Sequence, residues 1–330
     1  MQHELTIISA YHSDTSRHLL EKNEEFARTL LGRAPWTWIA VDNTPADYAG
    51  THPNREHFQV IKGVPYVEYL QTLEPWQKPI SAGFHHVQAI HKAFAESKTR
   101  FVLILDGDLY LVYRNWAEEV LRHMKEHQVA MLGTPWHPRW WKKVRYYPIH
   151  HALFIDTSLV PLSQIDLFPK YNGPEDLTEN RYGWLAPFSR VPWLRPFANA
   201  LRGRLLIGTS KDASYDMYVR FRNSELVLQT LTPVLHPYEQ ARPLKRFISR
   251  VVDYVATDRL SYTPRVGTYT TKGFKEHGCP DADGNGWEEF MWQGKPFGFH
   301  MRSYGNAGRR TPEENVTLLS QTLRYFVEKI

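Results

Sequence analysis

Segments typical of strands alternate with segments typical of helices along the first 160 residues of this chain. Short apolar, β-branched runs predict strands at 5–11, 36–43, 58–64, 100–112, 129–133 and 150–160. Stretches with helical spacing between them predict helices at 16–32, 81–97 and 115–128. This alternation favours an α/β fold, in which helices flank a mostly parallel sheet.

The second half of the chain is less regular. Pro, Trp and Arg are scattered through 161–210, after which a short helix at 212–222, a strand at 225–237 and a final helix at 311–330 are predicted. For 330 residues we therefore predict a main domain over 1–240 that carries a loop-rich insert at about 161–210, followed by an extension over 241–330.

The composition is that of an ordinary globular protein. Lys and Arg outnumber Asp and Glu by 40 to 35, an excess too small to indicate a nucleic-acid-binding coat by itself. Cys279 is the single cysteine and cannot form an intramolecular disulfide, which favours a reducing compartment. The sequence begins without a signal-peptide pattern and no apolar run approaches 18 residues. We therefore expect a cytoplasmic protein, with peripheral attachment to the inner membrane face left open.

Two carboxylates interrupt the apolar strand predicted at 100–112. Asp106 and Asp108 flank Gly107 directly after the run FVLIL. Burying ionised carboxylates is costly unless they have partners, and a bound divalent cation such as Mg2+ or Mn2+ would remove that cost. The alternative is a plain Asp-Gly turn at the end of a strand. The place of this strand in the series favours the metal site, because ligands bind beyond the carboxyl ends of parallel strands.

With these motifs in this order, the sequence resembles GT-A fold glycosyltransferases of the family-2 type, which transfer a sugar from a nucleotide donor. The opening run LTIISAYHSD is similar to the family's first strand and nucleotide-contacting loop, and Asp106-Gly107-Asp108 is similar to its DxD motif. The resemblance covers about residues 4–238. It implies a GT-A type, Rossmann-like fold and, since the signature of processive synthases is missing, the transfer of one sugar per encounter.

The resemblance also implies roles for individual residues. Those that it places at the nucleotide are Ala10, Tyr11, Asp42, Gly83, Asp106 and Asp108. The last two would hold Mn2+ or Mg2+ against the diphosphate, and a UDP-sugar is the expected donor.

An inverting transfer needs a carboxylate that removes the proton of the acceptor hydroxyl. The resemblance assigns this role to Asp212 or Asp216, but the Glu-Asp pair that the family shows at this point is absent. Such a pair occurs instead at Glu175-Asp176, which remains a competitor. The alternative role of Asp216 is a charge near a helix N-terminus, where the helix dipole stabilises it.

Histidine completes the metal site in some GT-A families, and two histidines are candidates for that role here. His236 lies at the end of the predicted strand 225–237, and His300 lies in GFHMRSYGN. Since the chain has 16 histidines, a structural or solvent-facing role is the alternative for His236. We expect the metal ligands to be Asp106, Asp108 and His236, with His300 as the second candidate histidine.

Two segments, 135–151 and 184–206, mix Trp, Tyr or Phe with Arg and Lys. Such mixtures suit the headgroup region of a membrane, stacking on bases or sugar rings, or an aromatic sub-core. We predict a metal-dependent, inverting hexosyltransferase whose acceptor is a glycan or a lipid-linked saccharide, with the extension 241–330 shaping the acceptor site. Two alternatives stay open: a glycosyltransferase that modifies a base in DNA, so that nucleic acid is the acceptor, and a non-catalytic nucleotide- or glycan-binding protein on the same scaffold.

Overall fold

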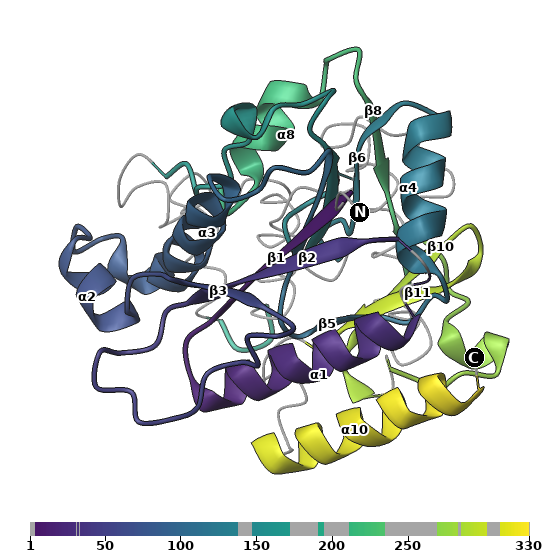
Figure 1. Ribbon diagram of the computed structural model, residues 1–330, viewed down its shortest axis with the longest axis horizontal. Coiled ribbons are helices and arrows are strands. Elements are labelled where there is room, and N and C mark those ends of the chain that lie inside the picture. The colour runs from purple at the N-terminus through teal and green to yellow at the C-terminus, as the bar shows by residue number, and fades with distance from the viewer. Residues whose placement is uncertain are drawn as a thin grey trace.

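A seven-stranded sheet with the strand order β3-β2-β1-β4-β7-β6-β8 forms the centre of the protein (Figure 1). A separate four-stranded sheet has the order β5-β11-β10-β9. The computed structural model describes residues 4–30, 32, 34–137, 147–171, 191–194, 211–234, 269–282, 285–301 and 311–329. The two sheets together bring segments from both halves of the sequence into one architecture.

The elements follow one another along the chain as follows. The large sheet contains β1 (Leu5–Tyr11), β2 (Trp36–Asp42), β3 (Gln59–Lys62), β4 (Phe101–Leu105), β6 (Val129–Gly133), β7 (Ala152–Asp156) and β8 (Val227–Thr230). The small sheet contains β5 (Leu109–Leu111), β9 (Thr232–Pro233), β10 (Glu288–Trp292) and β11 (Lys295–His300). The α-helices are α1 (Asp14–Leu30), α2 (Tyr66–Gln71), α3 (Ser81–Phe94), α4 (Trp116–Glu126), α8 (Tyr215–Phe221) and α10 (Pro312–Lys329), and short 3-10 helices lie at Lys78–Ile80, Leu162–Gln164 and Phe274–His277.

The large sheet is mostly parallel, as the sequence predicts. The pairs β1–β2, β1–β4, β2–β3 and β6–β8 are parallel, whereas β7 runs antiparallel to both of its neighbours, β4 and β6. Parallel strands need crossover connections, and α1 and α3 supply them. The carboxyl ends of β1, β2 and β4 therefore meet at one edge, and the start of β7 lies at that same edge.

Helices cover both faces of the large sheet. Side chains that alternate along β1 and β4 go to different cores: Ile7 and Leu103 join α1, α4 and α10, whereas Ile8 and Ile104 join α3 and α8. Helices α1 and α10 lie side by side, as Figure 1 shows. This arrangement confirms the predicted α/β class with a helix-flanked, mostly parallel sheet.

The strand predicted at 100–112 is divided between the two sheets. Its first part is β4, its last part is β5, and the turn between them closes with the Leu109 N–H donating to the Asp106 carbonyl at 3.0 Å. The strand predicted at 225–237 is likewise divided into β8 and β9. In both cases the segment is continuous in sequence, but the chain leaves one sheet and enters the other.

The sequence predicts no strand between 237 and 311, yet this segment contributes β10 and β11. These strands pair with β9 and β5, so part of the segment 241–330 completes a sheet begun by the segment 1–240. The predicted boundary at 240 and most of the insert at about 161–210 lie outside the described residues. The two-part division of the chain stays a prediction.

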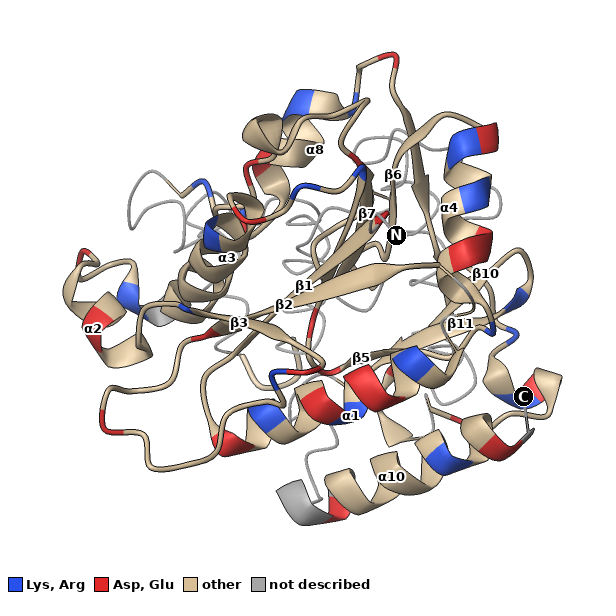
Figure 2. Cartoon of the chain, viewed as in Figure 1, with Lys and Arg blue, Asp and Glu red and all other residues tan. Residues whose placement is uncertain are grey.

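Charges of both signs alternate along the outer faces of α1 and α4 (Figure 2). Neither helix therefore presents a surface of a single sign. Among the helices that the structure describes, none combines the length and the apolar character needed to cross a membrane.

Candidate functional site

Two acids and two histidines meet at the edge where the strands of the large sheet end. Asp106 directly follows β4, and its N–H donates to the carbonyl of His151 at 2.8 Å, which fixes the start of β7 beside it. His300 ends β11 and lies opposite Leu109 of β5. The next residue, Met301, donates its N–H to the Asp108 carbonyl at 2.9 Å. Backbone pairing in both sheets therefore brings together residues that are far apart in sequence.

The turn that carries the acids is also held by a side chain of helix α1. Asn23 is fully buried in α1, and its side-chain amide donates to the carbonyls of Leu109 at 2.7 Å and Asp106 at 3.2 Å. A hydrogen-bonded, buried amide of this kind holds the turn in one conformation. The carboxylates of Asp106 and Asp108 consequently project from a rigid backbone.

The side chains form a compact cluster of possible metal ligands. Asp106, His151 and His300 each offer one ligand atom, and these atoms lie within 4.8 Å of one another. His300 Nε2 lies 3.0 Å from Asp108 Oδ1 and 3.7 Å from Asp106 Oδ2. A donor set of two imidazoles and one carboxylate, with a second carboxylate in reach, has the composition of a site for a divalent metal ion.

His86 of α3 faces the same acid from the other side. Its Nε2 lies 3.0 Å from Asp106 Oδ1. Burial alone would lower the pKa of His86, but the negative charges of Asp106 and Asp108 outweigh burial and raise it above its usual value. The cluster therefore attracts positive charge even without a metal ion, which is the electrostatic property that a cation site requires.

The structure brings together three of the residues expected at the metal, Asp106, Asp108 and the second candidate histidine, His300. The preferred histidine, His236, lies outside the described residues. The sequence analysis does not identify His151 or His86 as residues of the site. Nothing in the pattern around His151 shows that its strand runs antiparallel, so that the start of the strand, and not its end, meets the site.

The residues expected at the nucleoside lie on the neighbouring strands of the same edge. Ala10 and Tyr11 end β1, and Tyr11 pairs in register with Asp42 at the end of β2. Asp42 is buried and accepts hydrogen bonds from the Thr44 N–H at 2.9 Å and the Thr44 hydroxyl at 2.6 Å, and Lys62 lies 3.3 Å away. Burial opposes ionisation, yet these contacts outweigh it and hold the pKa of Asp42 below its usual range.

The Tyr11 hydroxyl is also engaged. It lies within hydrogen-bond distance of His52 Nδ1, at 3.2 Å, and burial, helped by the charge of Asp42, raises the pKa of Tyr11 well above its usual value. His52 belongs to the segment that follows β2, so this contact ties that segment to the end of β1.

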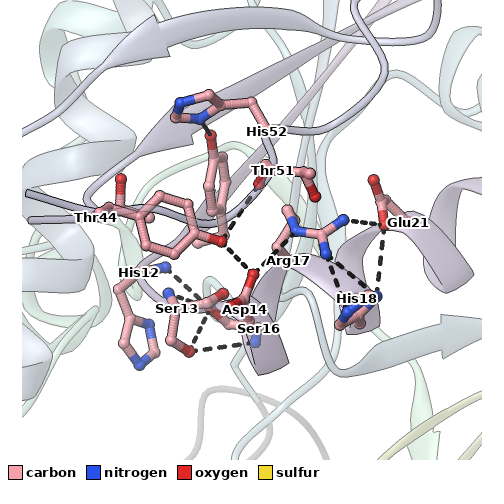
Figure 3. Close-up of polar contacts among 12 residues, drawn as sticks. His12, Ser13, Asp14, Ser16, Arg17, His18, Glu21, Thr44, Thr51 and His52 are labelled. Carbon is pink, nitrogen blue, oxygen red and sulfur yellow. Dashed lines mark hydrogen bonds and ion pairs between the residues drawn. The ribbon is translucent and has the colours of Figure 1, made fainter.

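A polar network fastens the same segment to the start of α1 (Figure 3). The Tyr48 hydroxyl contacts Asp14 and the carbonyl of Thr51, and Arg17 lies 3.6 Å from Asp14 and 2.6 Å from Glu21. The loop between β1 and α1 and the segment after β2 therefore form one connected wall beside Tyr11 and Asp42.

The two candidate bases lie in different surroundings. A Cβ placed on Gly83 of α3 would lie 3.4 Å from Asp212 Oδ1. Asp212 therefore lies against α3 at a position one helical turn before His86. Asp216, by contrast, pairs with Arg220 along α8 at 3.2 Å. Glu175 and Asp176 lie outside the described residues.

Ser214 connects the Asp212 segment to the histidine cluster. It has a left-handed backbone with φ 69°, is buried, and its hydroxyl lies 2.8 Å from His150 Nδ1. The His150 ring in turn lies 5.7 Å from that of His86. For a non-glycine residue this backbone conformation costs free energy, and such conformations are commonly found at functional sites.

The sequence matches no protein-family model and no curated protein. Solved structures with some similarity include the mannosyltransferase PcManGT from Pyrobaculum calidifontis in complex with GDP-Man and Mn2+, at 12% identity and a TM-score of 0.34 over 49% of this chain and 47% of that one. S. aureus TarS is 13% identical, with a TM-score of 0.33 over 54% of this chain and 55% of that one. M. tuberculosis glucosyl-3-phosphoglycerate synthase is 13% identical, with a TM-score of 0.38 over 78% of this chain and 81% of that one.

The chain spans about half the length of the first two of these proteins. Similarity at this level assigns neither a family nor an activity, so the function has to be argued from the site itself.

Proposed function

We propose that this protein is a metal-dependent glycosyltransferase with a GT-A type fold that moves one sugar from a nucleotide-sugar donor to an acceptor hydroxyl. The observation that carries the proposal is the pair Asp106 and Asp108 at the carboxyl end of a central parallel strand, facing two imidazoles. Ligands of α/β sheets bind at this edge. The two acids are also similar in sequence to the DxD motif of the family that the sequence resembles.

The cluster fits a divalent cation held by Asp106, His151 and His300, with Asp108 beside it. When bound, the ion supplies Lewis-acid stabilisation of the departing diphosphate. Nitrogen donors favour Mn2+ over Mg2+, which prefers a shell of oxygen atoms.

The other residues of this edge bind and orient the donor. The connected wall at Tyr11 and Asp42 would position the nucleoside, for which UDP is the expected carrier. The His86 imidazole lies 3.0 Å from Asp106 and would help to orient this carboxylate toward the ion.

Asp212 is the preferred base for the acceptor hydroxyl, because its carboxylate lies against α3 at Gly83, one helical turn before His86, whereas Asp216 lies on α8. A carboxylate base on the acceptor side corresponds to an inverting hexosyl transfer. The acceptor proposed is a glycan or a lipid-linked saccharide, and the protein is proposed to act in the cytoplasm, with contact at the inner membrane face. The aromatic and basic segments expected to shape the acceptor site lie mostly outside the described residues.

The test is a thermal-shift screen of UDP, GDP, CDP and dTDP and their sugars, each with and without Mn2+. A ligand at one hundred times its Kd stabilises the native state by about 2.7 kcal/mol. Unfolding entropy of about 2.1 cal/mol/K per residue gives roughly 0.7 kcal/mol/K for a chain of this length, so the expected shift is about 4 °C.

One nucleotide should stabilise the wild type only with Mn2+, and Asp106→Ala and Asp108→Ala should abolish the shift. Asp166→Asn is the control, since this aspartate pairs with Lys170, and it should leave the shift intact. No shift with any metal–nucleotide pair would overturn the proposal. Binding without release of a nucleoside diphosphate from any donor would favour the non-catalytic alternative, and DNA binding that weakens steeply with salt would favour the DNA-modifying one.

A further inference from the structure

Glu288 is a buried carboxylate behind the metal cluster that the proposed reaction does not use. It begins β10, is 1% exposed, and lies directly opposite His300 in the antiparallel pair β10–β11. His300 in turn lies opposite Leu109 of β5. The small sheet therefore places Glu288, His300 and the turn with Asp106 and Asp108 in one row.

The two nitrogens of His300 face different carboxylates. Nε2 faces Asp108 at 3.0 Å and Asp106 at 3.7 Å, whereas Nδ1 lies 3.8 Å from Glu288 Oε2. Nδ1 is buried and has no hydrogen-bond partner among the residues that the structure describes. A buried ring nitrogen in this position needs a partner, and Glu288 has the nearest carboxylate that could supply one.

The adjacent residue, Glu289, shows what a purely structural glutamate looks like in this strand. Its carboxylate accepts hydrogen bonds from the Ala282 N–H at 2.8 Å and the Phe274 N–H at 3.0 Å, which fix the preceding loop. Successive side chains of a strand point to opposite faces, so Glu288 faces His300 and Glu289 faces the loop. The strand thus carries two buried glutamates in different surroundings.

We propose that Glu288 is a positioning residue that holds His300 ready to bind the metal ion through Nε2. The inference rests on the metal site of the proposed function. An imidazole that binds a metal through one nitrogen keeps its proton on the other, and a carboxylate that accepts this proton fixes both the tautomer and the orientation of the ring.

Metal binding requires a change in the hydrogen bonds of His300. Without the ion, the Nε2–H donates to Asp108. With Nε2 on the ion, the neutral ring would release its Nε2 proton to solvent and carry its single proton on Nδ1, taken up from solvent, and this Nδ1–H would donate a hydrogen bond to Glu288. The negative charge of Glu288 also makes the imidazole a stronger ligand.

The experiment measures Mn2+ binding to the full-length wild type, Glu288→Gln and Glu289→Gln, by the loss of the free-ion EPR signal. Losing a carboxylate of this kind weakens metal affinity about 10- to 100-fold, and we expect that loss for Glu288→Gln. Glu289→Gln should lower the melting temperature and keep the Mn2+ affinity of the wild type. The visible spectrum of bound Co2+ should change in Glu288→Gln and stay unchanged in Glu289→Gln, because only the first substitution changes the hydrogen bonding of the ligand His300.

A folded Glu288→Gln variant with the Mn2+ affinity of the wild type would overturn the inference and leave the metal site standing. A wild type that binds no Mn2+ would overturn both. If Glu288→Gln does not fold, nitrogen NMR of the Zn2+-loaded wild type decides the question. A proton on His300 Nδ1 supports the inference, and a metal-bound or unprotonated Nδ1 overturns it.

Discussion

Replacing Gly298 by alanine should damage the proposed metal site without touching a proposed ligand. Gly298 lies in β11 two residues before His300, and a Cβ there would lie 2.8 Å from the backbone carbonyl oxygen of Tyr110 in β5. Ordinary contact begins at 3.4 Å, so β11 must move away from β5 by about 3.4 − 2.8 = 0.6 Å. The neighbour is backbone and has no flexible end that could move aside.

This displacement has two expected consequences. Crowding in a packed sheet costs about 1–3 kcal/mol, which corresponds to a fall in melting temperature of roughly 1–4 °C for a chain of this size. His300 moves with its strand, and about 0.6 Å is three times the tolerance of about 0.2 Å on a metal–ligand distance. We expect Mn2+ affinity to fall at least tenfold, measured by titration with EPR detection.

Gly294→Ala is the matched control. Gly294 lies in the turn between β10 and β11 with φ 75°, and a Cβ there would meet no atom within 4 Å. Its backbone strain costs about 1 kcal/mol, but the strand ends at Glu288 and His300 stay in place. A Gly298→Ala variant that is destabilised and still binds Mn2+ like the wild type would refute the view that the pairing of β11 with β5 places His300.

Substitutions of four other aspartates should affect either the stability of the fold or the proposed activity, but not both. Asp156 is buried and bonded to the half-exposed Arg100, so Asp156→Ala should cost about 1–2 kcal/mol in urea unfolding. Burial opposes ionisation of Asp156, but hydrogen bonds from Arg100 and its neighbours hold its pKa below its usual range. This stabilisation is therefore present above about pH 4 and is lost as the pH falls further, a loss that Asp156→Asn should remove. Asp212→Asn should lower kcat about 100-fold or more at unchanged donor affinity, whereas Asp216→Asn should stay within a few-fold of the wild type; the opposite order would make Asp216 the base. Asp42→Ala should weaken nucleotide binding in calorimetry and leave Mn2+ affinity unchanged, and equal losses of both would contradict a nucleoside role.

Local sequence patterns are enough to predict the frame of the large sheet. The apolar runs at β1, β2 and β4 identify buried strands, and the alternation with α1 and α3 predicts that those strands run parallel. Because parallel strands end at one edge, the chain alone assigns Asp42 and Asp106 to the same side of the sheet, and the pairing of β1 with β2 and β4 confirms it.

The second sheet was missed because its strands come from distant parts of the chain. β10 and β11 are short, and each is completed only by β9 or β5. One signal was present: two aromatic runs separated by Gln293-Gly294, both with positive φ, are typical of a tight hairpin.

The sequence by itself determined the α/β class and the edge of the sheet at which the two acids lie, because periodicity and strand-end carboxylates are local properties. Only the tertiary structure decided which histidines join them. His151 is there because β7 runs antiparallel, His86 because α3 packs against the sheet, and His300 because β11 pairs with β5. Strand direction and pairing depend on long-range hydrogen bonds and on the burial of whole faces, which no window of neighbouring residues contains. The acids could therefore be predicted from the chain, whereas of their histidine partners the chain offered only His300, as a second candidate.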